Sequence, residues 1–276
     1  MMNGKVCVVT GASAGIGKET AKALAAMGAT TALVCRNKER GDAAMAEISQ
    51  AFPNANTQLF LADLSSQKQV RRVAEELSRA FPKIDVLVNN AGVIENNRRV
   101  TEDGLEMTFA TNHLAYFLLT NLLLPNLKAA APSRIVSVSS AAHYGATLHF
   151  DDLQNEKEYN GWRAYGQSKL ANILFTFELA RRLDGTGVTA TCLHPGVIGT
   201  QLFRNLGLLN AVAGLFLVSP EKGAATTIYL ASSPDVEGVT GKYFDDKKIK
   251  EPSSAAQNIA DAKQLWDVSA ALCGLS

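Results

Sequence analysis

The sequence predicts an α/β fold in which a parallel sheet carries helices on both faces. Short apolar runs alternate with helical segments along the 276 residues. The first run, residues 6–9, leads through a glycine turn at residues 10–17 into a helical segment at 18–27. Strict strand–helix alternation implies parallel strands joined by right-handed crossovers, which is a doubly wound sheet. No linker, repeat or low-complexity tract divides the chain, so we expect a single domain over residues 1–276.

The later elements continue the same alternation. The predicted strands are residues 30–35, 58–62, 84–88, 134–139, 188–193 and 243–244, and the predicted helices are 39–52, 66–80, 105–124, 162–183, 221–231 and 255–272. Gly28 is expected to end the first helix, and Pro125 to end the helix that starts at Leu105. Ligands of such sheets bind beyond the carboxyl ends of the strands. The polar residues that follow the strands are therefore expected to share one cleft.

Composition indicates a soluble globular protein, with 47% hydrophobic and 19% charged residues. The net charge of +1 gives no reason to expect binding to nucleic acid or to an anionic membrane. No apolar run reaches the roughly 18 residues that a membrane span needs. The first strand begins about four residues from the start, which leaves no space for a signal or transit peptide. We therefore expect a cytoplasmic protein without a transmembrane segment.

Four cysteines lie at positions 7, 35, 192 and 273, and none forms a C-x-x-C pair. Cys7, Cys35 and Cys192 fall within apolar runs, so we interpret them as buried thiols in a reducing compartment. Metal binding needs clustered ligands, and the sequence shows none, so no metal site is expected.

The glycine turn has the spacing G-x-x-x-G-x-G, with Gly11, Gly15 and Gly17. Glycines permit positive φ angles and let a ligand approach the backbone closely. The helix that follows offers unpaired N–H groups and the positive end of its dipole, which suit a phosphate. The spacing differs from the G-x-G-x-x-G fingerprint, and a purely structural turn is the alternative. The strand–turn–helix context favours pyrophosphate binding.

Tyr165 and Lys169 are four residues apart in a predicted helix and therefore share one helix face. A phenol with a pKa near 10 is only about 0.1% ionised at pH 7, a deficit of roughly 4 kcal/mol. A nearby ammonium group lowers that pKa, so we expect Tyr165 to act as a general acid or base. The hydroxyl of Ser139 or Ser140, at a neighbouring strand end, can bond the same substrate oxygen.

A Tyr-x-x-x-Lys pair alone is more typical of a helix surface. Its occurrence together with the glycine turn and the Asn-Asn-Ala-Gly turn at residues 89–92 favours the chemical interpretation. In this combination the sequence resembles the short-chain dehydrogenase/reductase family over most of the chain. The residues that carry the resemblance are Thr10, Gly11, Gly15, Gly17, Asp63, Asn89, Asn90, Ala91, Gly92, Asn112, Ser140, Tyr165, Lys169, Pro195 and Gly196. The resemblance implies a Rossmann-like fold and hydride transfer between a nicotinamide and an alcohol or carbonyl.

One feature departs from the common family pattern. Ser140 and Tyr165 are 25 positions apart, about twice the usual separation in the family. The additional residues, from His143 to Trp162, are similar to the retinol dehydrogenase-like subgroup, and so is the stretch at residues 238–244.

The resemblance also implies roles for individual residues. The implied catalytic residues are Asn112, Ser140, Tyr165 and Lys169, with Asn112 joining the others in a proton relay through water. The implied cofactor-binding residues are Gly11, Ser13, Gly15, Ile16 and Gly17 in the glycine turn, Asp63 and Leu64 at the adenine, Asn90 and Gly92 at the adenosine ribose, Tyr165 and Lys169 at the nicotinamide ribose, and Ile198 and Thr200 at the carboxamide. The alternative for each is an ordinary turn or core residue.

The residue after the second strand indicates the choice of cofactor. NAD-binding proteins place an acid there for the ribose 2′-hydroxyl. This chain has Arg36, whose guanidinium can bind a 2′-phosphate with two bonds, and Lys38 and Arg40 add positive charge. We therefore predict NADP(H), with a solvated basic loop as the alternative.

An apolar segment at about residues 200–220, interrupted by Gly207 and Gly214, matches the family's substrate lid. An apolar lid favours an apolar alcohol or carbonyl substrate, such as retinal or a medium-chain aldehyde. Its leucines would otherwise pack on the sheet or on another subunit. Family members often form homodimers through the helices that contain Asn112 and Tyr165, so a homodimer is a further expectation.

The leading hypothesis is thus an NADP(H)-dependent oxidoreductase that interconverts an alcohol and an aldehyde or ketone. Two alternatives remain open. One is a light-dependent protochlorophyllide reductase, which the same family includes. The other is a non-catalytic NADP-binding regulatory protein that has kept the fold.

Overall fold

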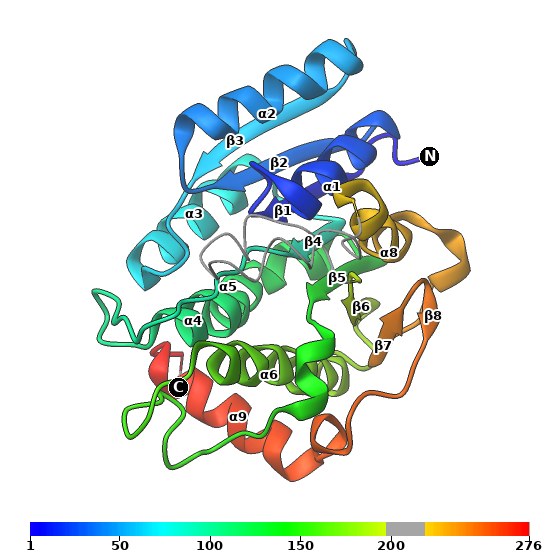
Figure 1. The fold of residues 1–276 in the computed structure, drawn as a ribbon. Coiled ribbons are helices and arrows are strands. Elements are labelled where there is room, and N and C mark those ends of the chain that lie inside the picture. Colours follow the sequence, from blue (N-terminus) through cyan, green and yellow to red (C-terminus); the bar gives the residue numbers. More distant parts are fainter. Residues whose placement is uncertain (197–218, 276) are drawn as a thin grey trace.

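A central sheet of eight strands organises the computed structural model, which describes residues 1–196 and 219–275. The strands lie in the order β3-β2-β1-β4-β5-β6-β7-β8 (Figure 1). Neighbours pair in parallel, except that β7 and β8 are antiparallel. The strands are β1 (Val6–Thr10), β2 (Thr30–Cys35), β3 (Asn56–Leu61), β4 (Val86–Asn89), β5 (Ser133–Val138), β6 (Val188–His194), β7 (Lys242–Asp245) and β8 (Lys248–Ile249).

Helices cover both faces of the sheet. They are α1 (Gly15–Ala26), α2 (Lys38–Ala51), α3 (Gln67–Ala80), α4 (Met107–Phe109), α5 (Ala115–Ala129), α6 (Gly161–Arg182), α8 (Pro220–Ser232) and α9 (Ile259–Leu272). Short helical turns lie at Ala110–Leu114 (π), Ala141–Gly145, Pro234–Val236 and Ser254–Gln257 (3-10). This arrangement confirms the predicted α/β class and the doubly wound, Rossmann-like sheet.

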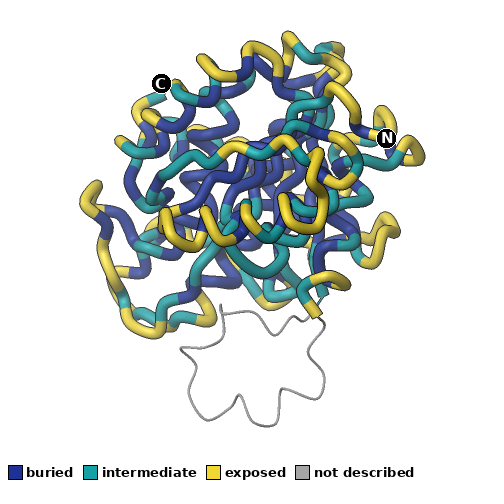
Figure 2. Tube along the Cα trace, turned by 90° about the horizontal axis from the view of Figure 1, so that it is seen from above, coloured by how far each residue is buried: buried dark blue, intermediate teal, exposed yellow. Residues whose placement is uncertain are grey.

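Alternation of side chains along the strands produces two apolar layers, one on each face. Val8 of β1 packs in the layer formed with α3, α5 and α6, whereas Cys7 and Val9 pack in the layer formed with α1, α2 and α8. Figure 2 shows the buried segments at the centre of the molecule and the exposed ones at its periphery. Because both faces are covered, these strands read as continuous apolar runs rather than as alternating ones.

The helix predicted over residues 105–124 differs from the structure. It starts as α4, passes through the π-helical turn and continues as α5 to Ala129, so Pro125 lies inside the helix and does not end it. A proline inside a helix removes one backbone hydrogen bond. Here tertiary contacts outweigh that loss, because Asn126 donates to the Phe81 carbonyl at 2.9 Å and the Leu127 side chain is fully buried.

The C-terminal helix α9 packs against α6, beside it in Figure 1. The Trp266 ring lies 4.9 Å from the Phe117 ring of α5 and 6.0 Å from the Phe175 ring of α6, measured between centroids. The Arg182 guanidinium lies 4.2 Å from the same indole. The homodimer stays a prediction, and it would have to form beside α9 rather than on the surface that α9 covers.

All four cysteines are buried and free of disulfide bonds. Burial raises the pKa of Cys7 to about 12 and that of Cys35 to about 11, and burial also raises the pKa of Cys192. These groups stay protonated at neutral pH, which agrees with the prediction of small buried hydrophobic residues at these three positions.

Candidate active site

A cleft of about 1500 Å³ runs along the carboxyl ends of the parallel strands. It is lined by Gly11, Ser13, Gly15, Ile16, Gly17, Arg36, Asp63, Leu64, Asn90, Gly92, Ser140, Tyr165 and Lys169, among others. The structure thus brings together all the predicted site residues that it describes, except Asn112. Ile198 and Thr200 lie outside the described residues, as does the predicted lid at about 200–220 apart from Ser219 and Pro220.

The glycine turn packs directly against the turn that follows β4. Gly11 and Gly15 have positive φ angles of 67° and 57°. A Cβ atom on Gly17 would lie 2.4 Å from both the Gly11 carbonyl oxygen and the Asn90 side-chain nitrogen. Asn90 closes this contact by donating its side-chain N–H to the Thr10 carbonyl at 2.8 Å. Only glycine fits at position 17 without displacing the turn.

The first turn of α1 is open toward the cleft. Its N-cap residue, Ala14, offers no side-chain bond to the helix N–H groups, and the first turn holds no acidic side chain. Unpaired N–H groups and the positive end of the helix dipole therefore face the cleft behind a glycine turn. This arrangement fits the pyrophosphate of a dinucleotide.

Basic residues after β2 differ in where they point. The Arg36 side chain is largely exposed, lines the cleft and lies 4.0 Å from the Asp63 carboxylate, measured from nitrogen to oxygen. Arg40 also lines the cleft. Lys38 instead bonds the Asp42 carboxylate at 2.6 Å on the surface of α2. Two of the three predicted cations thus line the cleft, and Lys38 does not.

The structure distinguishes between the two candidate serines. Ser139 is almost fully buried, and its hydroxyl donates to the Lys169 carbonyl at 2.7 Å. This bond joins the end of β5 to α6. The Ser140 hydroxyl accepts a bond from the Ala142 N–H at 3.2 Å. It lies close enough to the Tyr165 phenol to lower the pKa of that group. Ser140 therefore shares the phenol's surroundings, and Ser139 does not.

Tyr165 has an electrostatic environment opposite to the one expected from the sequence. Burial raises the pKa of Tyr165 to about 12, and the Ser140 hydrogen bond opposes this only in part. The predicted lowering by Lys169 is wrong for the protein without ligands, because desolvation of the phenolate dominates. The phenol is therefore protonated at neutral pH in the protein without ligands.

Lys169 lies deep in the same cleft. Its ammonium nitrogen is 5.6 Å from the centre of the Tyr165 ring and donates to the Val138 carbonyl at 3.0 Å. Burial lowers the pKa of Lys169 to about 7. The group thus titrates near neutral pH, so its charge responds to any acceptor or anion placed beside it.

This buried lysine leads to a testable pH dependence of stability. An unfolded lysine keeps its proton up to about pH 10.4, whereas Lys169 loses its proton above about pH 7 in the folded protein. Between these values the unfolded chain binds more protons, so the free energy of unfolding rises with pH. We expect wild type to gain about 2 kcal/mol relative to Lys169→Met between pH 7 and pH 9 in urea unfolding. Parallel pH dependences of the two proteins would contradict the assignment.

Asn112 is the one described candidate that does not line the cleft. It is fully buried in the π-helical turn, where its side chain accepts from the Val93 N–H at 2.7 Å and donates to the Val93 carbonyl at 2.9 Å. It also donates to the Ser168 hydroxyl at 3.0 Å. The side-chain amide thus joins the turn after β4 to α6. π-helical turns are frequent at functional sites.

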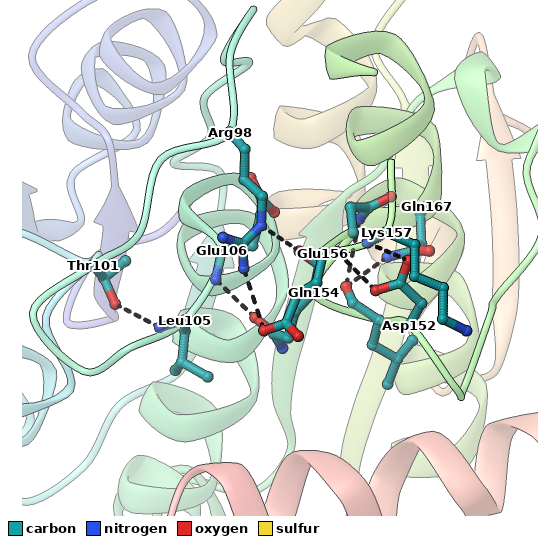
Figure 3. A network of polar contacts seen from close by, with 11 residues as sticks. Arg98, Thr101, Leu105, Glu106, Asp152, Gln154, Glu156, Lys157 and Gln167 are labelled. Carbon is teal, nitrogen blue, oxygen red and sulfur yellow. Dashed lines mark hydrogen bonds and ion pairs between the residues drawn. The ribbon is translucent and has the colours of Figure 1, made fainter. Parts of the chain in front are cut away.

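Several residues between Ser140 and Tyr165 line the cleft. This segment is hydrogen-bonded to residues 95–106, and Figure 3 shows part of that network. Arg98 donates to the Gln154 carbonyl at 3.0 Å, and the Gln154 side chain accepts from the Glu106 N–H at 2.7 Å. Gln167 of α6 donates to the Leu153 carbonyl at 3.0 Å. The insertion is therefore bonded on two sides, and it contributes His149, Glu158 and Asn160 to the cleft lining.

Sequence reasoning missed Trp162 as a site residue. Its ring lines the cleft with its centroid 5.7 Å from that of Tyr165. A spacing of three residues on one helix places both rings on the same face, and this is the signal that points to it. Trp162 thus extends the apolar surface next to the phenol.

Comparisons with known proteins agree with this geometry. The family model described as short chain dehydrogenase matches residues 5–208. "Retinol dehydrogenase 14" from Homo sapiens is 44% identical, over 100% of this chain and 88% of its own length. Among solved structures, an uncharacterised protein from Mycobacterium paratuberculosis matches with a TM-score of 0.82 and 34% identity, over 99% of this chain and 94% of that chain. A short chain dehydrogenase from Burkholderia cenocepacia J2315 in complex with NADP matches with a TM-score of 0.73 and 26% identity, over 93% of this chain and 99% of that chain.

The chain belongs to the short-chain dehydrogenase family and is similar to its retinol dehydrogenases. It is therefore an oxidoreductase that uses a nicotinamide cofactor. The resemblance drawn from the glycine turn, Tyr165 and Lys169 is confirmed at the level of the family.

Proposed function

We propose that the protein is an NADP(H)-dependent oxidoreductase that interconverts an apolar alcohol and its aldehyde or ketone, with retinal or a medium-chain aldehyde as the type of carbonyl. The observation that carries the cofactor choice is Arg36, which stands at the end of β2 where NAD-binding proteins have an acid. Its exposed guanidinium lines the cleft. A planar guanidinium matches the geometry of a 2′-phosphate.

The proposed catalytic residues are Tyr165, Ser140 and Lys169, with Asn112 as a supporting residue. The nicotinamide supplies hydride chemistry when bound. In the direction of reduction, the Tyr165 phenol donates its proton to the carbonyl oxygen, and its pKa of about 12 keeps that proton available at neutral pH. The Ser140 hydroxyl donates a hydrogen bond to the same oxygen as negative charge develops there.

The two remaining residues hold this arrangement in place. Lys169 carries the cationic group beside the phenol, and its bond to the Val138 carbonyl fixes the position of that group. Asn112 fixes the turn after β4 through Val93, and Gly92 of that turn lies beside Lys169, since a Cβ on Gly92 would be 3.6 Å from the ammonium nitrogen. Asn112 thus acts here through its contacts with the backbone.

The substrate class rests on the retinol dehydrogenases among the relatives and on the apolar ring of Trp162 beside Tyr165. Reduction is the proposed direction, because NADPH is usually supplied in its reduced form. No helix within residues 1–196 and 219–275 has the length and apolarity to cross a membrane. The cytoplasmic location stays a prediction.

Replacing Arg36 with Ala tests the choice of cofactor. We expect the Kd of NADPH to rise about 10- to 100-fold, because a charge-assisted pair with the 2′-phosphate is lost, while the Kd of NADH changes little. Fluorescence titration with both cofactors measures this difference. Lys38→Ala is the matched control, because Lys38 bonds Asp42 and is expected to leave both Kd values unchanged. An unchanged preference for NADPH in Arg36→Ala would refute the assignment.

A further inference from the structure

The turn Ala141–Gly145, which follows Ser140, is held by two histidines from different parts of the chain. His143 lies within the turn and is fully buried. His194 lies at the end of β6, the strand next to β5 in the sheet. Each imidazole bonds backbone atoms at or beside Ser140, and neither bond was expected from the sequence.

The bonds of His143 fix its tautomer. The Ser253 N–H donates to His143 Nε2 at 3.2 Å, so Nε2 carries no proton. The proton is therefore on Nδ1, which donates to the Ser140 carbonyl at 2.6 Å. Neutral His143 thus links the Ser140 backbone to the segment that leads into α9. Protonation of Nε2 would bring its N–H against the Ser253 N–H, and the hydrogen bond would be lost.

His194 makes the complementary bond on the other side of Ser140. The Ala141 N–H donates to His194 Nδ1 at 3.1 Å, so this nitrogen must also be unprotonated. Ser140 therefore has its own carbonyl bonded by one imidazole and the next amide bonded by the other. Protonation of His194 at Nδ1 would replace an acceptor with a donor at this point.

Several charged or titratable groups surround the two rings. The Tyr144 and Tyr243 rings flank His143 at 4.0 and 5.0 Å between centroids. Asp245 of β7 pairs in register with His194 and bonds Lys250 at 2.7 Å. Burial and then Lys250 lower the pKa of His143, apart from an opposing contribution of the Ser140 bond. Burial lowers the pKa of His194 against the opposing charge of Asp245, and His143 and Lys250 add to the lowering.

We propose that neutral His143 and neutral His194 are positioning residues that hold the Ser140 backbone so that its hydroxyl stays beside the Tyr165 phenol in the cleft. The proposal rests on the proposed function, because it concerns the serine assigned to the reaction. Loss of either neutral imidazole releases the turn. His194 also lines the cleft, but the glycine turn and Arg36, where the dinucleotide is proposed to bind, lie on other elements. Each histidine thus contributes to the acid limit of turnover, because protonation of either ring disrupts a bond that holds the turn.

The test uses the full chain and four variants. His143→Phe keeps a ring between Tyr144 and Tyr243 but removes both bonds, and His194→Leu removes the acceptor. His194→Asn places an amide oxygen near the Nδ1 position and restores an acceptor that does not titrate. Tyr144→Phe is the control, because it removes only the bond to the Glu251 carbonyl and is expected to leave kcat within about twofold.

We expect kcat to fall about 10- to 100-fold in His143→Phe and His194→Leu, with the Kd of NADPH unchanged. His194→Asn is expected to keep kcat within about threefold of wild type, because it restores an acceptor for the Ala141 N–H. Unchanged kcat in both loss variants, or a kcat in His194→Asn as low as in His194→Leu, would overturn the proposal.

A second readout needs no turnover. Hydrogen exchange of the Ala141 amide is expected to accelerate at least about tenfold in His194→Leu and to stay slow in His194→Asn. Equal protection of the Ala141 amide in wild type and His194→Leu would overturn the proposal. If none of the carbonyls tested is reduced by wild type with NADPH, the proposed function fails. The hydrogen-exchange result then decides by itself whether the histidines hold the turn.

Discussion

Replacing Tyr165 with Phe is expected to lower kcat for carbonyl reduction by about 10³-fold or more and to leave the Kd of NADPH within about threefold. The phenol is the group placed to donate a proton, and its pKa of about 12 keeps it protonated. Loss of a positioned general acid typically costs 10²- to 10⁴-fold. Phenylalanine keeps the ring against Trp162, so the cleft retains its shape.

Single-turnover oxidation of NADPH measures this effect, with Kd obtained separately by fluorescence titration. Tyr116→Phe is the matched control. Tyr116 is buried beside Lys169, and its hydroxyl bonds the Ala91 carbonyl at 2.8 Å, outside the cleft lining. We expect Tyr116→Phe to lower the free energy of unfolding but to keep kcat within about threefold of wild type. Retained turnover in Tyr165→Phe would contradict the role of Tyr165 as the proton donor. A wild-type protein that is inert with every carbonyl would instead favour the non-catalytic, cofactor-binding alternative.

Replacing Gly17 with Ala is the second change with a large expected effect. The added Cβ would meet the Gly11 carbonyl and the Asn90 side chain at 2.4 Å, so the glycine turn must move. We expect the Kd of NADPH to rise about 100-fold or more, because the glycine turn and the backbone N–H groups at the start of α1 are displaced. The free energy of unfolding is expected to fall by about 1–3 kcal/mol through overpacking.

Fluorescence titration and urea unfolding measure these two quantities. Gly238→Ala is the control, because Gly238 has a positive φ of 71° and no atom within 4 Å of a built Cβ. It carries backbone strain without a clash, so it is expected to lower stability modestly and to leave the Kd of NADPH unchanged. Normal NADPH binding by Gly17→Ala would contradict the assignment of the glycine turn.

Much of the fold was predictable because short apolar runs and helical segments alternate along the sequence. The strand at 30–35 matches β2, and the helix at 162–183 matches α6 within one residue. Pro125 misled the prediction, because local propensity says nothing of the buried bond between Asn126 and the Phe81 carbonyl. Strand β8 was missed because two residues, Lys248 and Ile249, are too short for a periodic signal.

The site was predictable in its membership and less so in its energetics. Spacing on a helix places Tyr165 and Lys169 together, but it cannot show that both are buried deeply enough for desolvation to dominate their pKa values. The choice between Ser139 and Ser140 also depends on which hydroxyl faces α6. The bonds of His143 and His194 join segments far apart in the chain, and no local pattern encodes such contacts.

Turnover of the wild-type protein with retinal and a series of medium-chain aldehydes, measured as loss of NADPH and in parallel of NADH, tests the central claim most directly. We expect oxidation of NADPH with at least one apolar carbonyl and a kcat/KM at least about tenfold higher than with NADH. Failure of every carbonyl to oxidise NADPH, or an equal or greater kcat/KM with NADH, would contradict it.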